Sequence, residues 1–403
     1  MNAPLDVEAL RAQFPILARP VRGKRLAYLD NAATTQKPRA VIEAISRYYE
    51  TSNANVHRAV HALAEAATTQ YEAARDTIAR FVGAAREEIV FTRGTTEAVN
   101  LVARSFLQPR LRPGDQVLLT GMEHHSNIVP WQLAGAETLA APVLDNGEVD
   151  LEAWTALLGP RVRLVAVSQV SNTLGTVNPL ATLIARAHAQ GIPVLVDGAQ
   201  GLAHERVDLH ALGADFYVAG AHKAYGPTGF GFLYGRREHL EAMPPWQGGG
   251  DMIRSVAFEG SSWNEPPYRF EAGTPDMAGA IGCAAALDWI EAQGLERLAG
   301  HEQALLREAT ERLSRIPGLR LIGTAPHKGA ILSFVVDGAP AADLGSLLDL
   351  EGVAIRTGHH CTMPLMKRYG VAATARASLA AYNNGEDLEQ FERALHKALR
   401  LLS

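Results

Sequence analysis

The sequence predicts an α/β fold in which a mostly parallel sheet, covered by helices on both faces, is followed by a smaller α+β domain. The chain has 403 residues, more than the ~250–300 at which a single hydrophobic core stops growing, so two domains are expected. Between residues 88 and 234, short apolar strand patterns alternate with helix patterns, which is typical of right-handed crossovers in a parallel sheet. Beyond about Ala280 the alternation gives way to long helices and then to mixed elements.

Composition and charge exclude several classes of protein. With 47% hydrophobic and 20% charged residues, the chain is neither disordered nor collagen-like. Its net charge of −5 gives no basic surface for nucleic acid. Only Cys283 and Cys361 are present, which excludes a disulfide framework and favours a reducing compartment. The first residues do not form a signal peptide and no uncharged apolar run reaches the ~18 residues of a membrane span, so we expect a cytoplasmic protein without a membrane segment.

The N-terminal elements are predicted from caps and periodicity. Asp6 is a suitable N-cap for a short helix through Gln13, and residues 26–30 form a strand pattern. Two helix patterns follow, at 38–49 and at 59–82, each with apolar residues on one face.

The central elements come next, and the wholly apolar runs at 164–167 and 193–196 fit strands that are buried on both faces. The predicted strands and then the predicted helices are Glu88–Thr92, Gln116–Thr120, Arg163–Gln169, Val194–Asp197, Phe216–Ala219 and Phe230–Tyr234, with Ala98–Leu107, Ile128–Ala134 and Leu180–Gln190.

The C-terminal part is predicted to be a separate α+β unit. The Gly- and Pro-rich stretch 244–267 precedes it, and we expect no regular element there. The resulting division is an N-terminal segment 1–20 packing with the small domain, a large domain 21–283 and a small domain 284–403. The predicted helices and then strands of the small domain are Ala284–Leu298, Glu302–Arg315, Ala341–Glu351 and Asp387–Leu401, with Leu319–Ile322, Ile331–Val336, Val353–Arg356 and Arg376–Ala380.

Two charged residues at strand ends suggest a cofactor. Asp197 ends a buried strand, and Lys223 follows the next one; alone, each would be read as a turn former or a surface charge. Open α/β sheets bind ligands at the carboxyl ends of their strands. Pyridoxal phosphate requires a lysine amine for its aldehyde and an anion for its pyridine nitrogen. Together the two residues therefore predict a pyridoxal-phosphate site.

The same site needs a phosphate cradle and a ring to cover the cofactor. The segment 93–97, Arg-Gly-Thr-Thr-Glu, lies between a strand and a helix start and offers backbone N–H groups and hydroxyls, although a plain helix cap would look similar. His124 follows another strand and can supply the ring.

Two other interpretations of these residues are weaker. The pairs His124–His125 and His359–His360, with Cys361, contain metal-ligand types, but adjacent residues in extended backbone point apart and no familiar metal motif is present. We therefore expect no catalytic metal. The glycines of the stretch 229–235 do not have the spacing of a dinucleotide-binding turn.

Over essentially its full length the sequence resembles class II, SufS-like cysteine desulfurases, within the aminotransferase class V group of fold-type I pyridoxal-phosphate enzymes. That fold type has a large domain with a mostly parallel seven-stranded sheet and a smaller C-terminal domain. Nine stretches in the family's order carry the resemblance: 28–33, 56–58, 93–97, 122–125, 171–176, 196–200, 222–229, 269–275 and 356–361.

The resemblance implies the contacts of the cofactor. Lys223 would hold it and remove the substrate Cα proton, Asp197 would pair with the pyridine nitrogen, and His124 would stack on the ring. Gln200 would donate a hydrogen bond to the phenolic oxygen. The phosphate would be held by Thr95, Thr96 and His222, with Thr274 contributed by the other subunit of a homodimer.

The resemblance also implies the substrate contacts. Arg376, assisted by Asn172, would bind the carboxylate of L-cysteine, since a guanidinium group donates two parallel hydrogen bonds. His57 and Arg58 would approach from the other subunit. Cys361, in a polar loop whose cationic neighbours favour the thiolate, would take the substrate sulfur as a persulfide and leave alanine. A small acceptor protein of the SufE or SufU type would then carry the sulfur to iron–sulfur cluster assembly.

Three alternatives and two departures accompany this resemblance. Selenocysteine lyase activity is the nearest alternative; a racemase or β-lyase would not need Cys361, and a non-catalytic scaffold would not need the cofactor at all. Gly220 stands where the family commonly has a phosphate-binding serine, and Thr362 where alanine is frequent.

Overall fold

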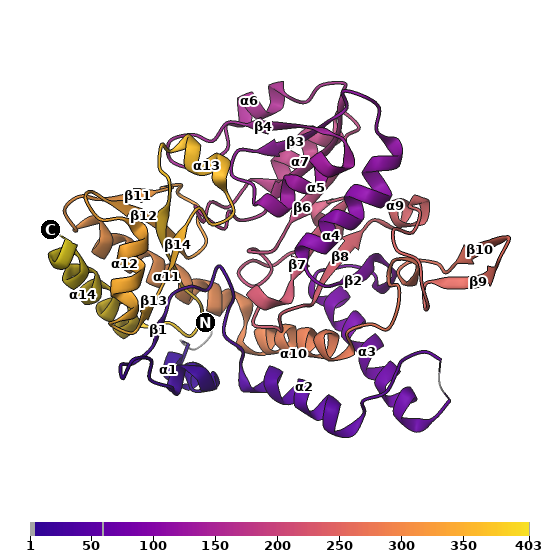
Figure 1. Ribbon diagram of the computed structural model, residues 1–403, viewed down its shortest axis with the longest axis horizontal. Coiled ribbons are helices and arrows are strands. Elements are labelled where there is room, and N and C mark those ends of the chain that lie inside the picture. The colour runs from indigo at the N-terminus through magenta and orange to yellow at the C-terminus, as the bar shows by residue number, and fades with distance from the viewer. Residues whose placement is uncertain (1–4, 59, 403) are drawn as a thin grey trace.

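A seven-stranded sheet forms the centre of the computed structural model, which describes residues 5–58 and 60–402 (Figure 1). Its strand order is β2-β8-β7-β6-β5-β3-β4, and only β8 runs antiparallel to its neighbours. The predicted fold class is therefore confirmed. The strands are β2 (Ile89–Thr92), β3 (Gln116–Thr120), β4 (Glu137–Ala141), β5 (Val162–Ser168), β6 (Val194–Asp197), β7 (Phe216–Gly220) and β8 (Gly231–Gly235).

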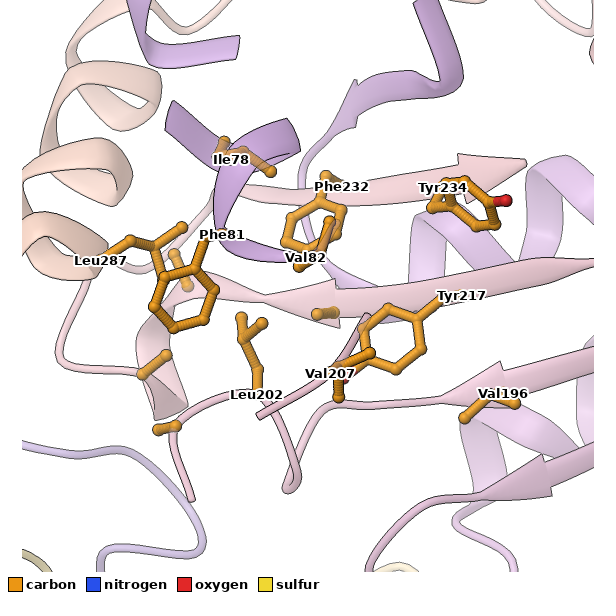
Figure 2. Packing of buried hydrophobic residues seen from close by; sticks show 14 of the residues in the cluster. Ile78, Phe81, Val82, Val196, Leu202, Val207, Tyr217, Phe232, Tyr234 and Leu287 are labelled. Atoms are coloured by element: carbon orange, nitrogen blue, oxygen red, sulfur yellow. The ribbon is translucent and has the colours of Figure 1, made fainter. Parts of the chain in front are cut away.

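Helices cover both faces of this sheet, as the apolar strands require. Within β5, Val165 belongs to the hydrophobic cluster on one face and Leu164 to the cluster on the other. Figure 2 shows part of the first cluster, to which the covering helices contribute Phe81 and Leu287 and the sheet contributes Tyr217. The helices of that face are α2 (Arg39–Thr51), α3 (Ala62–Phe81), α6 (Leu151–Ala156), α7 (Leu180–His188) and α10 (Met277–Gln293). Those of the opposite face are α4 (Thr95–Leu101) with its π-helical continuation Val102–Leu107, α5 (Val129–Ala134) and α9 (Arg237–Ala242).

A second hydrophobic cluster surrounds a four-stranded antiparallel sheet of order β11-β12-β15-β14, which lies at the left of Figure 1. The N-terminal strand also joins this unit, because β1 pairs in parallel with β13 through Ala27 and Val353. The elements are β1 (Ala27–Tyr28), β11 (Leu319–Ile322), β12 (Ile331–Val336), β13 (Val353–Ala354), β14 (Arg356–Gly358), β15 (Thr374–Ser378), α11 (Leu295–Ser314), α12 (Ala341–Asp349), α13 (Met363–Arg368) and α14 (Gly385–Leu402).

The division into domains stays a prediction. The expected boundary between residues 283 and 284 falls inside α10, and this helix belongs to the cluster of the large sheet. The first turns of α11 contribute Leu295 and Leu298 to the same cluster.

The N-terminal segment contacts both parts of the molecule. Its helix α1 (Val7–Arg11) begins at the expected cap, where Asp6 accepts a hydrogen bond from the Ala9 amide. Arg11 forms a buried ion pair with Asp387 of α14, and Phe14 belongs to the cluster of the large sheet. Residues 1–4 of the predicted segment 1–20 lie outside the described residues.

Several sequence predictions are corrected. The stretch 244–267 is not wholly irregular, because β9 (Ile253–Ala257) and β10 (Gly260–Trp263) form a hairpin that projects at the right of Figure 1. The break between the two long C-terminal helices is at Gly294, earlier than predicted. Some short elements were not predicted: β4, α6, α8 (Leu209–Leu212), α9 and α13. Residue 59, the predicted start of the second N-terminal helix, lies outside the described residues, and α3 begins at Ala62.

No described helix has the length and apolar character needed to cross a lipid bilayer.

Candidate active site

A cavity of about 1260 Å³ lies at the carboxyl ends of the strands of the large sheet. Strands β6 and β7 end at its wall, so the residues that follow them reach the same space. The cavity brings together ten of the predicted site residues: Thr95, Thr96, His124, Asn172, Asp197, Gln200, His222, Lys223, Cys361 and Arg376.

Lys223 and Asp197 are charged partners inside this cavity. Asp197 is buried, and its Oδ1 accepts a hydrogen bond of 3.0 Å from the Ala199 amide. Lys223 ends the 3-10 turn Ala221–Lys223 that follows β7. Burial lowers the pKa of Lys223 to about 8, although the charge of Asp197 opposes this shift. Burial also raises the pKa of Asp197. The lysine is thus a base that titrates near neutral pH.

His124 is held as a neutral ring. Its Nδ1 lies 2.7 Å from the Ser126 hydroxyl and accepts a hydrogen bond of 3.1 Å from the Ser126 amide. Burial, together with the charge of Lys223, lowers the pKa of His124 to about 4. Uncharged at neutral pH, the imidazole can cover an aromatic ligand without repelling a cation beside it.

Glu123, directly before His124, is a buried carboxyl group that sequence reasoning did not select. It accepts hydrogen bonds from the Thr120 hydroxyl at 2.6 Å, from the Asn127 amide group at 2.8 Å and from the Ser168 amide at 3.1 Å. Burial raises the pKa of Glu123 to about 7.

The predicted phosphate cradle contains an unsatisfied hydroxyl. The Oγ1 atom of Thr95 is buried and has no hydrogen-bond partner. A Cβ atom built on Gly220 would lie 3.3 Å from this oxygen and 3.2 Å from the His222 ring. The glycine therefore leaves the space between Thr95 and His222 free. Buried hydroxyls are normally paired, so the orphaned Thr95 oxygen fits an oxygen-rich ligand group.

Arg376 is a buried cation that also lines the cavity. Its Nη1 donates to the Asn172 main-chain oxygen at 2.7 Å, and its Nη2 lies 3.4 Å from Asp30 Oδ1. Its Nε is buried without a partner. Asp30 also binds Arg356, another cavity residue, at 3.1 Å. Arg376 is 2% exposed, so an anion entering the cavity would meet a positioned guanidinium group.

Cys361 lies on the cavity wall in the loop between β14 and α13. The Asn172 side chain donates to the main-chain oxygen of His360 at 2.8 Å, so the residue expected at the substrate also supports this loop. Gln200, expected at the cofactor, donates to the Ala32 oxygen at 2.7 Å. The other cysteine, Cys283, is fully buried on α10, and burial raises its pKa to about 12. The buried position of Cys283 agrees with its predicted role as a small hydrophobic residue.

The three residues expected to serve another subunit do not line the cavity. Thr274 lines a separate cavity of about 380 Å³. His57 and Arg58 are exposed, with His57 bound to Glu72 at 2.9 Å and Arg58 to Asp251 at 2.8 Å. Their predicted roles stay predictions.

Further residues shape the site without having been selected from the sequence. Asp30 and Arg356 lie within stretches that carry the family resemblance, which was the available signal, but only the structure shows that they contact each other. The other cavity residues not selected include Ser126, Trp246 and His360.

The comparisons with known proteins agree with this architecture. Residues 27–391 match the model of the family described as aminotransferase class-V. The chain belongs to the aminotransferase class-V family. It is 51% identical over 401 residues to a probable cysteine desulfurase of Xylella fastidiosa strain 9a5c, covering 98% of this chain and 96% of the relative. It is 50% identical to a cysteine desulfurase of Dickeya dadantii, covering both chains completely.

Solved structures of the class-V fold are similar as well. The cysteine desulfurase CsdA of Escherichia coli superimposes with a TM-score of 0.93 at 40% identity, and the apo cysteine desulfurase of Thermococcus onnurineus NA1 with 0.94 at 37%; each comparison covers the whole of both chains.

Class-V aminotransferases are pyridoxal-phosphate enzymes, and the residues of this cavity fit that cofactor. Lys223 supplies an amine and Asp197 a buried carboxylate. Thr95 contributes an orphaned hydroxyl of the kind that a phosphate oxygen would satisfy. Across residues 5–58 and 60–402, no group of three or more His, Cys, Asp or Glu side chains is arranged to hold a metal ion.

Proposed function

We propose that this protein is a pyridoxal-phosphate-dependent cysteine desulfurase that converts L-cysteine to L-alanine and takes the sulfur onto Cys361. The observation that carries the proposal is that one cavity holds an amine, a buried guanidinium group and a thiol: Lys223, Arg376 and Cys361. A simple lyase or racemase would need the first two only. The named relatives support the same activity.

The roles of the residues follow from their chemistry. When bound, pyridoxal phosphate supplies an electron sink that stabilises negative charge beside the substrate Cα. Asp197 would hold the pyridine nitrogen, while Thr95, Thr96 and His222 would hold the phosphate. Arg376 binds the substrate carboxylate and so orients the Cα–H bond, and the Lys223 amine takes the Cα proton, for which its pKa of about 8 is suited.

Sulfur transfer takes place between two sulfur atoms. The Cys361 thiolate attacks the substrate sulfur, the substrate Cβ–S bond breaks, and its electron pair stays on Cβ, which is then protonated to the methyl group of alanine. A persulfide remains on Cys361. This step needs no external oxidant or metal, because the new S–S bond replaces the C–S bond.

We extend the proposal to partners and location. The enzyme acts as a homodimer in the cytoplasm, with Thr274, His57 and Arg58 contributed to the cavity of the partner subunit; their positions outside their own cavity support this arrangement. A small acceptor protein of the SufE or SufU type receives the persulfide sulfur for iron–sulfur cluster assembly.

The test compares alanine release from L-cysteine, with reductant, by the wild type, Cys361→Ala and Cys283→Ala. We expect Cys361→Ala to lose nearly all alanine formation while the bound cofactor keeps its absorbance. Cys283→Ala, the matched control, should keep the wild-type rate. Equal alanine release by the wild type and Cys361→Ala would overturn the persulfide route and favour a lyase, to be assayed with L-selenocysteine.

A further inference from the structure

The segment of residues 359–363, here called the Cys361 loop, contains two consecutive left-handed residues. His360 has φ 50° and Cys361 has φ 59°. Residues with a Cβ atom adopt this conformation at a steric cost and keep it only where surrounding contacts impose it. Glycine would avoid that cost, but a thiol at this position requires the side chain. The contacts that hold Cys361 in place therefore need an explanation.

Two histidine rings make contacts with the backbone of this loop. The Nδ1 atom of His359 accepts a hydrogen bond of 3.0 Å from the Cys361 amide. The Nε2 atom of His125 accepts one of 3.1 Å from the Met363 amide. The His125 amide in turn donates to the Cys361 oxygen at 2.8 Å. The Cys361 amide is thus bound by the His359 ring, the Met363 amide by the His125 ring, and the Cys361 oxygen by the main chain of His125.

The two contacts made by the rings require unprotonated ring nitrogens. Backbone N–H groups can only donate, so each imidazole must offer a lone pair at the contacting nitrogen, and an imidazolium ion has none. The two ring centroids lie 5.6 Å apart, so a charge on His359 would oppose protonation of His125. Burial lowers the pKa of His125, and the nearby His359 lowers it further.

The other side-chain contacts of the loop act at residues other than Cys361; the His360 ring, for example, lies 2.8 Å from the Thr374 hydroxyl. The Asn172 side chain binds the His360 oxygen, and the Thr362 hydroxyl lies 2.9 Å from that of Thr173. Neither contact touches the amide or the oxygen of Cys361. The rings of His125 and His359 do not line the cavity, so these residues can influence the substrate only through the loop.

We propose that His125 and His359 are positioning residues that, as neutral hydrogen-bond acceptors, hold Cys361 in its left-handed conformation and keep its thiol on the cavity wall. The proposal rests on the proposed role of Cys361 as sulfur acceptor. It gives a function to the second member of the His124–His125 pair and the first member of the His359–His360 pair, neither of which lines the cavity.

The test uses amide side chains as matched replacements. Asparagine places an oxygen near the position of Nδ1 and glutamine near that of Nε2, and neither titrates at neutral pH. The holoenzyme variants are His359→Ala, His359→Asn, His125→Ala and His125→Gln, with His396→Ala on the exposed face of α14 as control. Two quantities are measured: the rate of Cys361 alkylation by iodoacetamide without substrate, followed by peptide mass spectrometry, and kcat and KM for alanine formation.

We expect each alanine variant to alkylate Cys361 several-fold faster, because the loop is released, and to lose about tenfold in kcat with little change in KM, the effect of one lost hydrogen bond on positioning. His359→Asn and His125→Gln should restore both rates to within about twofold of the wild type. The cofactor absorbance should not change in any variant.

Alanine variants with wild-type alkylation and kcat, or amide variants that behave like the alanine variants, would overturn the proposal. The second result would assign proton transfer to the histidines instead. The alkylation rate measures how firmly the histidines hold the Cys361 loop, even if Cys361→Ala proves fully active. Failure of this proposal is therefore distinguishable from failure of the proposed function.

Discussion

The side chain of Arg376 donates a hydrogen bond to the main-chain oxygen of Asn172 at 2.7 Å, and the Asn172 side chain supports the loop that carries Cys361. Asn172 therefore contacts Arg376 through its main chain and the Cys361 loop through its side chain. A change at Arg376 should affect substrate binding first.

Replacement of Arg376 by lysine should weaken the binding of L-cysteine. Lysine keeps the charge but not the planar fork that gives two parallel hydrogen bonds to a carboxylate. We expect kcat/KM to fall about 10–100-fold, the effect of losing one charge-assisted bond, with most of the change in KM. Steady-state alanine formation measures this, and a KM within about twofold of the wild type would contradict it.

Replacement of Gly220 by serine should tighten cofactor binding. The new Cβ would lie 3.2 Å from the His222 ring and 3.3 Å from the orphaned Thr95 oxygen, so small shifts of side chains accommodate it. The serine hydroxyl can then pair with Thr95 or bind phosphate. We expect the dissociation constant of pyridoxal phosphate, from fluorescence titration of the apo protein, to fall about tenfold. An increase in the dissociation constant would show that the steric cost of the serine side chain exceeds the gain from its hydrogen bond.

The rate at which the apo protein captures pyridoxal phosphate should rise with pH around a midpoint near 8. Only the neutral amine of Lys223 reacts with an aldehyde, and burial places its pKa at about 8. Stopped-flow absorbance gives the rate, and N-acetyl-lysine amide, whose amine titrates near 10.4, corrects for titration of the cofactor. Asp197→Asn should lower the midpoint, because Asp197 raises this pKa. A midpoint above 9.5 would contradict the prediction.

The stability of Glu123→Gln relative to the wild type should increase with pH. The folded-state pKa of Glu123 is raised from 4.5 to about 7. Its favourable contribution is therefore fully present below pH 4.5 and is lost as pH rises through 7, whereas glutamine does not titrate. Urea unfolding at pH 5 and pH 8 should show the difference in free energy of unfolding shifting by about 2–3 kcal/mol in favour of the variant. A pH-independent difference would show that Glu123 ionises normally.

Replacement of Arg11 by methionine should destabilise the fold. Arg11 donates to Asp387, to the Tyr382 oxygen and to the Leu26 oxygen, all in buried surroundings. Removing one partner of a buried pair leaves an unsatisfied charge, although Arg25 still contacts Asp387. We expect the free energy of unfolding to fall by about 3 kcal/mol, measured in urea. A loss below about 1 kcal/mol would mean that Arg25 replaces the ion pair.

Much of this fold is predictable because its strands are buried on both faces. The apolar runs that became β5 and β6, flanked by turn residues, were recognisable, and the polar residues directly after them mark the ligand-binding edge. The β9–β10 hairpin gave no such signal, because its residues are almost all exposed and have no apolar alternation. The edge strand β4 is likewise mostly exposed or half-buried.

The site was predictable where local sequence determines chemistry and not where distant segments meet. Lys223 and Asp197 could be selected from their positions after strands. The contacts of Asp30 with Arg356 and Arg376 join the two ends of the chain, and no periodicity reports such a contact. The left-handed backbone at Cys361 is imposed by histidines from two segments, which overrides the local preference of a cysteine.

The pairing of β1 with β13 has a consequence for synthesis of the protein. Ala27 leaves the ribosome long before Val353, its partner in the ladder, and Ala27 and Leu29 both belong to the second hydrophobic cluster. That cluster cannot close until most of the chain has been translated, and nascent chains must keep the first strand unpaired until then. A chain terminated before residue 353 would lack this ladder and also both arginines that bind Asp30, so it would have neither a complete core nor the guanidinium groups of the candidate site.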